Sequence, residues 1–182
     1  MAFNLNKKYP ELLEINHYRS EYDRDVILRK IFDRDIQENG KLIYNSKQIH
    51  PLKDIEGVSS MNDLFGHLTR EGTKEIDSNG KTIASRNVFE QDRSMRIHWI
   101  KTHLDEKVKD KIEVFSIIER DKKKREDVTK TYIYNTVKKY VVVLMCQRSN
   151  KDYYLLTAYY LNKTYGEKDI KRKMKNCLPC IL

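Results

Sequence analysis

The sequence predicts an α+β protein in which N-terminal helices are followed by a helix packed on a four-stranded antiparallel sheet. Three observations support this prediction. Apolar side chains recur every three or four residues in the first part of the chain, and every second residue in the later part. Short polar turns separate the later apolar runs. Helices first and strands after them is an α+β layout.

The first half of the chain is predicted to be mostly helical. An apolar stripe favours a helix, with room for one break, from Glu11 to Gln37; Pro10 precedes it and Asn39-Gly40 ends it. After a short extended piece at 41–44, a serine cap begins a second helix over 59–68. Residues 70–87 are polar and contain the turn signal Asp77-Ser78-Asn79-Gly80, which indicates a loop or a hairpin.

A third helix, over residues 90–106, leads into the predicted sheet. Four strands are expected, at residues 112–118, 131–135, 140–145 and 153–161, and they should pair as an antiparallel meander. A last basic helix is expected from Glu167 to Lys175. The chain therefore divides into an N-terminal helical region (1–87), an α+β domain (88–176) and a C-terminal tail (177–182).

Composition and length place the chain among cytoplasmic, soluble proteins. Of the 182 residues, 39% are hydrophobic and 35% charged, enough for one modest core. The longest apolar run, residues 141–146, is far shorter than the ~20 residues of a membrane span, and no signal peptide is evident. Three cysteines do not make a disulfide framework. We interpret Cys177-Leu178-Pro179-Cys180 as an incidental tail rather than half a zinc site or a redox pair.

The excess positive charge lies in the second part of the chain. Residues 1–100 hold 16 basic and 16 acidic side chains, whereas residues 101–182 hold 20 basic and 11 acidic ones. Lysine and arginine attract phosphates, and tyrosine rings stack on unpaired bases, so this combination favours single-stranded RNA as a partner. The alternative is that tyrosine is here only a strand former and lysine only keeps the domain soluble. Eight of the twelve tyrosines lie in this part: Tyr132, Tyr134, Tyr140, Tyr153, Tyr154, Tyr159, Tyr160 and Tyr165.

The predicted helix over 90–106 carries the first candidate site residues. Projected at 100° per residue, Arg93, Arg96 and His103 fall on or beside the apolar side, whereas His98 and Lys101 point the other way. Two guanidinium groups in this position would clamp a phosphate. The alternative is that they extend to solvent or pair with a carboxylate at the edge of the core.

The last predicted strand carries two more candidates. Thr157 and Tyr159 share one face, and Tyr154, Ala158 and Tyr160 share the other. A threonine and a tyrosine in an apolar central strand place hydroxyl groups where core is expected. For Tyr159 the alternative is packing in the core with its hydroxyl at the edge.

These segments, taken in order, resemble a known family. The chain resembles, over about residues 88–175, the phage-associated nucleases of the barnase/EndoU/colicin/RelE-like group, known as the BECR fold. Members of that group fold as helices packed on a four-stranded antiparallel sheet. The resemblance rests on three motifs: Arg93-x-x-Arg96-Ile97-x-Trp99-Ile100, Tyr140-Val141-Val142-Val143-Leu144 and Leu155-Leu156-Thr157-Ala158-Tyr159-Tyr160.

The resemblance implies metal-independent cleavage of RNA, by a toxin or a phage or mobile-element effector that a partner such as an antitoxin or immunity protein inhibits. The 2′-hydroxyl attacks the adjacent phosphate, which requires a base, an acid and positive charge on the phosphate. Arg96 would hold the phosphate, His103 would serve as acid or base, and Thr157 and Tyr159 would orient the phosphate or the ribose. The expected substrate-binding residues are Arg93, Lys101, Tyr132, Tyr134 and Tyr160.

Other chemistries lack their motifs. The sequence contains no Gly-rich phosphate loop, no His-Glu-x-x-His helix and no Gly-x-Ser-x-Gly elbow, so we expect neither a metal nor a cofactor. His98 and His103 are five residues apart and do not share a helix face, which disfavours a metal pair. A non-catalytic module that binds RNA or protein on the same scaffold is the alternative function. The N-terminal helices could cover the sheet, bind an inhibitor or form a homodimer.

Overall fold

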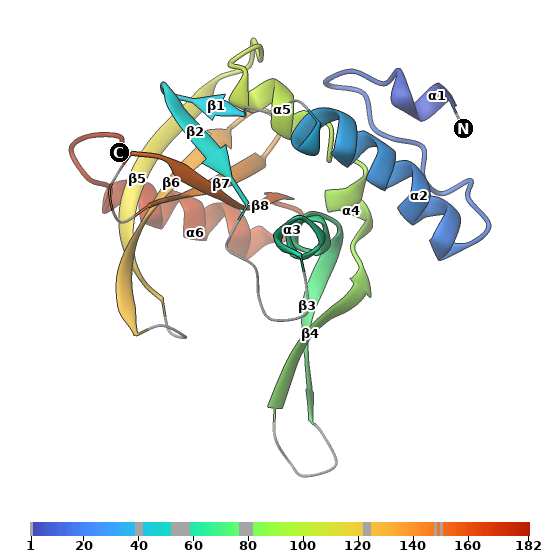
Figure 1. Ribbon diagram of the computed structural model, residues 1–182. Helices are drawn as coiled ribbons and strands as arrows, with labels where there is room; N and C mark the ends of the chain where they lie inside the picture. Colours follow the sequence, from blue (N-terminus) through green and yellow to red (C-terminus); the bar gives the residue numbers. More distant parts are fainter. Residues whose placement is uncertain are drawn as a thin grey trace.

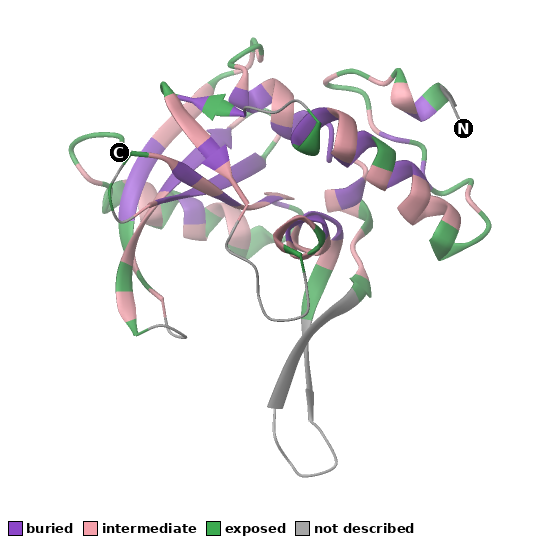
Figure 2. Ribbon diagram, viewed as in Figure 1, coloured by how far each residue is buried: buried purple, intermediate pink, exposed green. Residues whose placement is uncertain are grey.

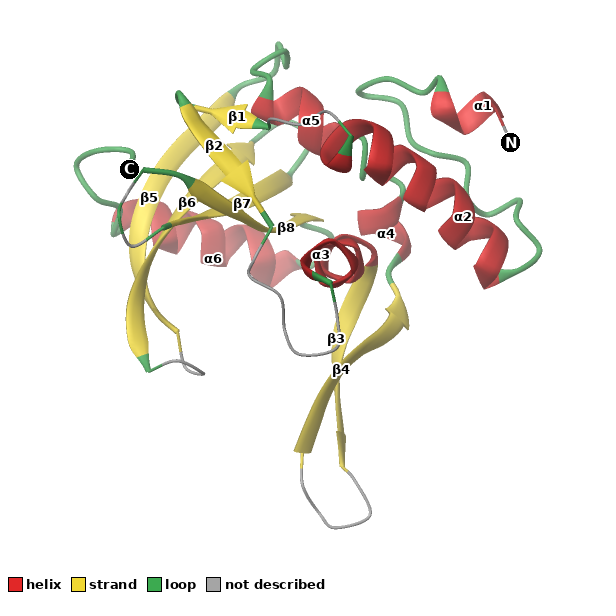
Figure 3. Ribbon diagram, viewed as in Figure 1, coloured by secondary structure: helices red, strands yellow, loops and turns green. Residues whose placement is uncertain are grey.

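The computed structural model describes residues 2–38, 42–51, 59–76, 82–121, 125–147, 149 and 151–182. Within these residues the fold is mixed α+β, as the sequence predicts (Figures 1 and 3). The helices are α1 (Ala2–Leu5), α2 (Glu21–Phe32), the π-helical η1 (Asp33–Gln37), α3 (Ser60–Thr69), α4 (Gln91–Ser94), α5 (Trp99–Leu104) and α6 (Thr164–Lys175). The strands are β1 (Ile43–Tyr44), β2 (Lys47–His50), β3 (Arg70–Ile76), β4 (Thr82–Phe89), β5 (Ile112–Asp121), β6 (Glu126–Asn135), β7 (Tyr140–Cys146) and β8 (Tyr153–Tyr160).

The main sheet has six strands rather than the expected four. Its order is β1-β2-β8-β7-β6-β5, and the antiparallel meander β5–β8 forms the predicted part. Strand β2 extends it by pairing parallel to β8, with Ile49 opposite Tyr153. Parallel pairing of a four-residue strand depends on contacts distant in sequence, so no local signal announces it. Strands β3 and β4 form a separate hairpin that projects from the body; its expected turn at 77–80 lies outside the described residues (Figure 1).

The first expected helix begins ten residues late. Residues 11–15 are not helical, and Leu13 and Ile15 are buried as alternate residues. The Asn4 side chain holds this segment, because its Oδ1 accepts from the Glu14 amide at 2.8 Å and its Nδ2 donates to the Glu14 carbonyl at 3.3 Å. The apolar spacing there is therefore two rather than three or four. The helix starts at Glu21, because the Ser20 hydroxyl caps it by accepting from the amide of Asp23.

The expected helix over 90–106 is broken into α4 and α5. Between them the amides of Arg96, Ile97 and Trp99 bond carbonyls three residues back instead of four, which winds the chain more tightly. This turn shifts every later side chain relative to a continuous α-helix. As a result His98, expected at the solvent face, is buried.

Both faces of the sheet are covered, which explains why all seven residues of β7 are buried (Figure 2). One face packs under α6, where Val141 and Val143 join a cluster with Ile170. The other face carries the larger cluster, which includes Val142 and Leu144. That cluster combines buried residues between positions 13 and 68 with others between positions 97 and 158, so the boundary expected near residue 87 does not separate two cores.

The C-terminal segment, residues 177–182, lies against the sheet. The amide of Leu178 donates to the Ser116 carbonyl at 2.7 Å, and the amide of Leu182 donates to the Ser116 hydroxyl at 3.1 Å. The Leu182 carbonyl accepts from the Thr131 hydroxyl at 3.0 Å, from Tyr153 and from Cys146. The segment is thus part of the packed structure, while the two cysteines within it are exposed and free.

Candidate functional site

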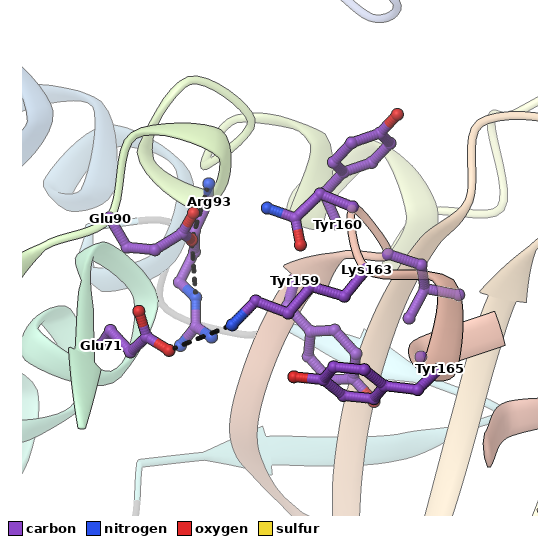
Figure 4. A pocket seen from close by; sticks show the side chains of 10 residues that line it. Glu71, Glu90, Arg93, Tyr159, Tyr160, Lys163 and Tyr165 are labelled. Carbon is purple, nitrogen blue, oxygen red and sulfur yellow. Dashed lines mark hydrogen bonds and ion pairs between the residues drawn. The ribbon is translucent and has the colours of Figure 1, made fainter. Parts of the chain in front are cut away.

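A pocket of about 210 Å³ opens where the end of β8, the start of α6 and the start of α4 meet β3 (Figure 4). Its residues combine two cations, two carboxylates and three tyrosines with a small apolar floor. Three of the sequence-predicted residues, Arg93, Tyr159 and Tyr160, meet here. The full lining is Glu71, Glu90, Arg93, Tyr159, Tyr160, Leu161, Asn162, Lys163, Tyr165 and Gly166.

Arg93 is held in place by three elements. Its Nη1 donates to the carbonyl of His67 in α3 at 2.6 Å and to the hydroxyl of Thr157 in β8 at 3.3 Å. Its Nε lies 3.4 Å from Oε2 of Glu90, which also caps α4 by accepting from the Arg93 amide at 3.0 Å. Among the described residues Nη2 has no hydrogen-bond or ion-pair partner. Figure 4 shows the guanidinium facing Lys163 and Glu71, so one fixed donor group is left for a ligand.

The second cation of the pocket is more exposed and less firmly held. Lys163 lies 3.6 Å from Glu71, and half of each side chain is exposed. This carboxylate raises the pKa of Lys163, so the amine stays charged at neutral pH. An ion pair of this length and exposure contributes little, so an incoming phosphate can compete with Glu71 for the amine.

The three tyrosines differ in their surroundings. Tyr165 is 65% exposed and offers a free ring face. Tyr160 is stacked against the guanidinium of Arg96, whose central carbon lies 4.0 Å from the ring centre. Tyr159 packs toward α6, and burial raises the pKa of its hydroxyl, so that hydroxyl stays protonated and acts as a donor. The pocket thus offers one ring for stacking and one neutral hydroxyl.

A groove continues from the pocket along α6. It shares Tyr159, Leu161, Tyr165 and Gly166 with the pocket and adds Lys168, Asp169 and Arg172. Together the pocket and this groove form a track of about two helical turns along a basic helix. An extended chain of phosphates is the kind of ligand that such a track fits.

Arg96 is sealed away from this pocket. It is 7% exposed, and its guanidinium lies between Tyr160 and Trp99. Its Nη1 bonds the carbonyl of Asp92 at 2.6 Å and the carboxylate of the same residue at 3.2 Å. The expected open contact between Arg96 and the hydroxyls of β8 is therefore absent from the described structure. The alternative interpretation, pairing with a carboxylate at the edge of the core, matches the geometry.

His103 is buried with both ring nitrogens bonded. Nδ1 donates to the carbonyl of Trp99 at 2.7 Å, because a carbonyl can only accept, and Nε2 then accepts from the Asn135 amide at 3.2 Å. Burial lowers the pKa of the imidazole. His103 is 3% exposed and is absent from the pocket lining, so the expected proton transfer at the site has no geometric basis.

Of the other predicted residues, Thr157, Tyr159 and Tyr160 lie near Arg93, whereas Tyr132, Tyr134 and Lys101 lie elsewhere. Tyr159 packs on the α6 face of the sheet and Tyr160 on the opposite face, as the alternation predicts. Tyr132 is buried under α6, where its hydroxyl bonds Glu119 and Lys173, and Tyr134 is buried on the same face. Thr157 supports Arg93 rather than facing the pocket, and Lys101 pairs with Asp105 in a different groove.

Sequence reasoning missed Glu71, Glu90, Lys163 and Tyr165 as a group. Only Tyr165 carried a signal, as one of the tyrosines of the basic part. Glu71 and Lys163 are 92 positions apart, and only the packing of β3 beside the β8–α6 loop brings them together. Among the described residues no three His, Cys, Asp or Glu side chains gather as metal ligands would.

Comparison with protein families, curated proteins and solved structures finds no match for the chain. None of the described helices has the length and apolar character that crossing a membrane requires.

Proposed function

We propose that the chain is a metal-independent endoribonuclease whose site is the pocket around Arg93. One observation carries the proposal: a guanidinium held by α3, α4 and β8 presents its last donor group beside a lysine, an exposed carboxylate and an exposed tyrosine ring. The resemblance to the BECR nucleases supports the same activity. Of the residues expected on the helix at 90–106, Arg93 lies in this pocket, whereas Arg96 and His103 do not.

The chemistry of the pocket residues assigns each a role in this proposal. Arg93 and Lys163 would bind the phosphate and offset the charge that develops on it. Tyr165 would stack on the adjoining base, which is worth about 1–3 kcal/mol per base. The exposed carboxylate of Glu71 would take the proton of the 2′-hydroxyl, and the Tyr159 hydroxyl would give its proton to the departing 5′-oxygen. Exchange with water would then remove the proton from Glu71 and return one to Tyr159. Attack by the 2′-oxygen leaves a 2′,3′-cyclic phosphate and a 5′-hydroxyl.

Cleavage of a labelled single-stranded RNA in EDTA tests the proposal. Lys163→Ala removes one charge-assisted contact, so we expect binding about tenfold weaker or more, and a shallower salt dependence. Glu71→Gln should abolish product while binding stays equal or becomes tighter, since a like charge leaves the phosphate site. Lys175→Ala, an exposed lysine of α6 outside the pocket, is the matched control.

The outcomes separate the enzyme from the alternative. If the wild type binds RNA but gives no product from any RNA, the proposed nuclease activity is wrong and the chain is a non-catalytic RNA-binding module. Equal binding by the wild type and Lys163→Ala would remove the pocket from RNA recognition altogether.

A further inference from the structure

A second groove, of about 750 Å³, lies where the loop after α1 meets η1 and α5. It shares no lining residue with the pocket around Arg93. Two carboxylates, Asp35 and Asp105, line it against five cations: Lys7, Lys8, Arg34, Lys101 and Lys107.

The carboxylates leave part of this positive charge uncompensated. Asp105 forms ion pairs with two lysines, Lys101 at 3.2 Å and Lys107 at 2.9 Å. The amine of Lys8, which is exposed, has no ion pair among the described residues. Lys7 pairs with Glu14 at 3.1 Å and Arg34 pairs with Asp35 at 2.7 Å. The positive charge that an anion would meet in the groove therefore comes from the exposed amine of Lys8 and from the two lysines that share Asp105.

One residue that lines the groove has a buried acceptor that lacks a donor. His98 lines the groove and is 4% exposed. Its Nε2 lies 3.1 Å from the carbonyl of Glu11; since a carbonyl only accepts, Nε2 carries the hydrogen and Nδ1 presents a lone pair. Nδ1 is buried and has no hydrogen-bond partner among the described residues. Buried polar atoms are rarely left in this state without a ligand or a water to satisfy them.

We propose that this groove binds a small phosphorylated ligand that also carries a hydrogen-bond donor, of the size and chemistry of a nucleoside monophosphate. The phosphate lies among Lys8, Lys101 and Lys107, and a hydroxyl or amine of the ligand donates to Nδ1 of His98. The volume of the groove falls in the range of small-molecule sites, about 300–1,000 Å³. The site does not depend on the nuclease proposal, because its residues are separate.

Titration of the full chain with adenosine monophosphate, inorganic phosphate and adenosine tests the site. We expect saturable binding of the monophosphate, weaker binding of inorganic phosphate, and the weakest binding of adenosine. In the wild-type protein labelled with ¹⁵N in histidine, the monophosphate should shift the Nδ1 resonance of His98 and leave that of His103 in place. Sulfate, which carries no proton at neutral pH, should leave both resonances in place, because it brings no donor to a neutral imidazole.

Two variants assign the contacts. The double variant Lys101→Gln/Lys107→Gln should bind the monophosphate at least about tenfold more weakly, since two charged contacts are lost. The matched control is Lys109→Gln/Lys175→Gln, which removes two exposed lysines outside the groove. His98→Phe should lower the affinity for the monophosphate and leave the affinity for inorganic phosphate unchanged. A thermal melt checks that this variant folds.

Three results would overturn the site. One is equal affinity of the wild type and the lysine double variant. Another is a His98 resonance that does not move at saturation. The third is binding that Lys163→Ala abolishes, which would locate the phosphate in the pocket around Arg93. If Lys163→Ala loses RNA cleavage but still binds the monophosphate with wild-type affinity, the proposed nuclease site and the groove site are distinct, and the groove proposal stands.

Discussion

His98 and His103 are close in sequence and both buried, yet their ring nitrogens are used differently. His103 is held in one tautomer by Trp99 and Asn135, so its imidazole joins α5 to the end of β6. Within the described part of the chain, the only hydrogen-bond partner of His98 is the carbonyl of Glu11. Burial lowers the pKa of His98 to about 4, while the backbone bond to Glu11 and the charge of Asp35 act in the opposite direction. Each ring is therefore neutral in the folded protein near pH 7.

This gives a pH dependence of stability with a definite sign. The unfolded chain binds a proton at His98 near pH 6.5, whereas the folded chain does so only near pH 4. Stability is therefore full above about pH 6.5 and falls as the pH is lowered toward 4, by about 2 kcal/mol between pH 7.5 and pH 5 for this residue. His98→Gln keeps an amide donor for Glu11 but does not titrate. Urea unfolding at both pH values should show a smaller loss in that variant; equal losses would contradict the prediction.

At the scale of elements, the C-terminal segment binds a row of polar side chains that crosses four strands. Ser116, Thr131, Cys146 and Tyr153 come from β5, β6, β7 and β8, and each bonds the main chain of Leu182. Ser116 and Thr131 are fully buried. Without the segment these hydroxyls would lose partners in an otherwise apolar sheet, so the segment and the row should stabilise each other.

A double-mutant cycle measures that coupling. Thr131→Val removes the hydroxyl that donates to Leu182, and should lower the free energy of unfolding by about 1–2 kcal/mol. In a chain shortened to end at Asn176 the same substitution should cost clearly less, because the partner is already gone. Urea denaturation of the four proteins gives the coupling. An equal cost in both backgrounds would show that the segment does not depend on the row.

The elements also show what local sequence patterns can and cannot predict. The meander β5–β8 follows from period-two apolar runs, and α3 follows from its cap at Ser59. The break between α4 and α5 has no glycine or proline to announce it, and it misplaces His98 in any continuous projection. Strand β2 pairs with β1 and also with the distant strand β8, which no local pattern indicates. Arg93 is predicted from the projection of its helix, but tertiary packing alone brings Lys163 into the same pocket.

On the scale of the whole molecule, the sheet and its larger core combine both halves of the sequence. Strand β2 pairs with β8, and α3 packs beside the same strand. Phe32, Leu64 and Phe65 share one cluster with Ile100 and Leu155. The described residues of α2, β2 and α3 are therefore part of the support of the sheet rather than an appendage to it.

A fragment of residues 88–182 should consequently fail to fold as a cooperative unit. It would expose the apolar face that α2 and α3 cover, and it would leave β8 as an open edge. We expect poor dispersion of its amide resonances and a broad thermal transition, against a single sharp one for the full chain. Adding residues 1–87 as a separate chain should restore the dispersion. A fragment that melts cooperatively alone would contradict this account.

The guanidinium of Arg93 reaches a carbonyl of α3 and a hydroxyl of β8, and the rest of its pocket comes from β3 and α6. Residues between positions 67 and 166 must therefore be packed in place before the pocket forms. Any activity of the pocket then requires the fully folded chain. A nicked, truncated or half-assembled copy would lack the pocket, and under the proposed function it could not cleave RNA.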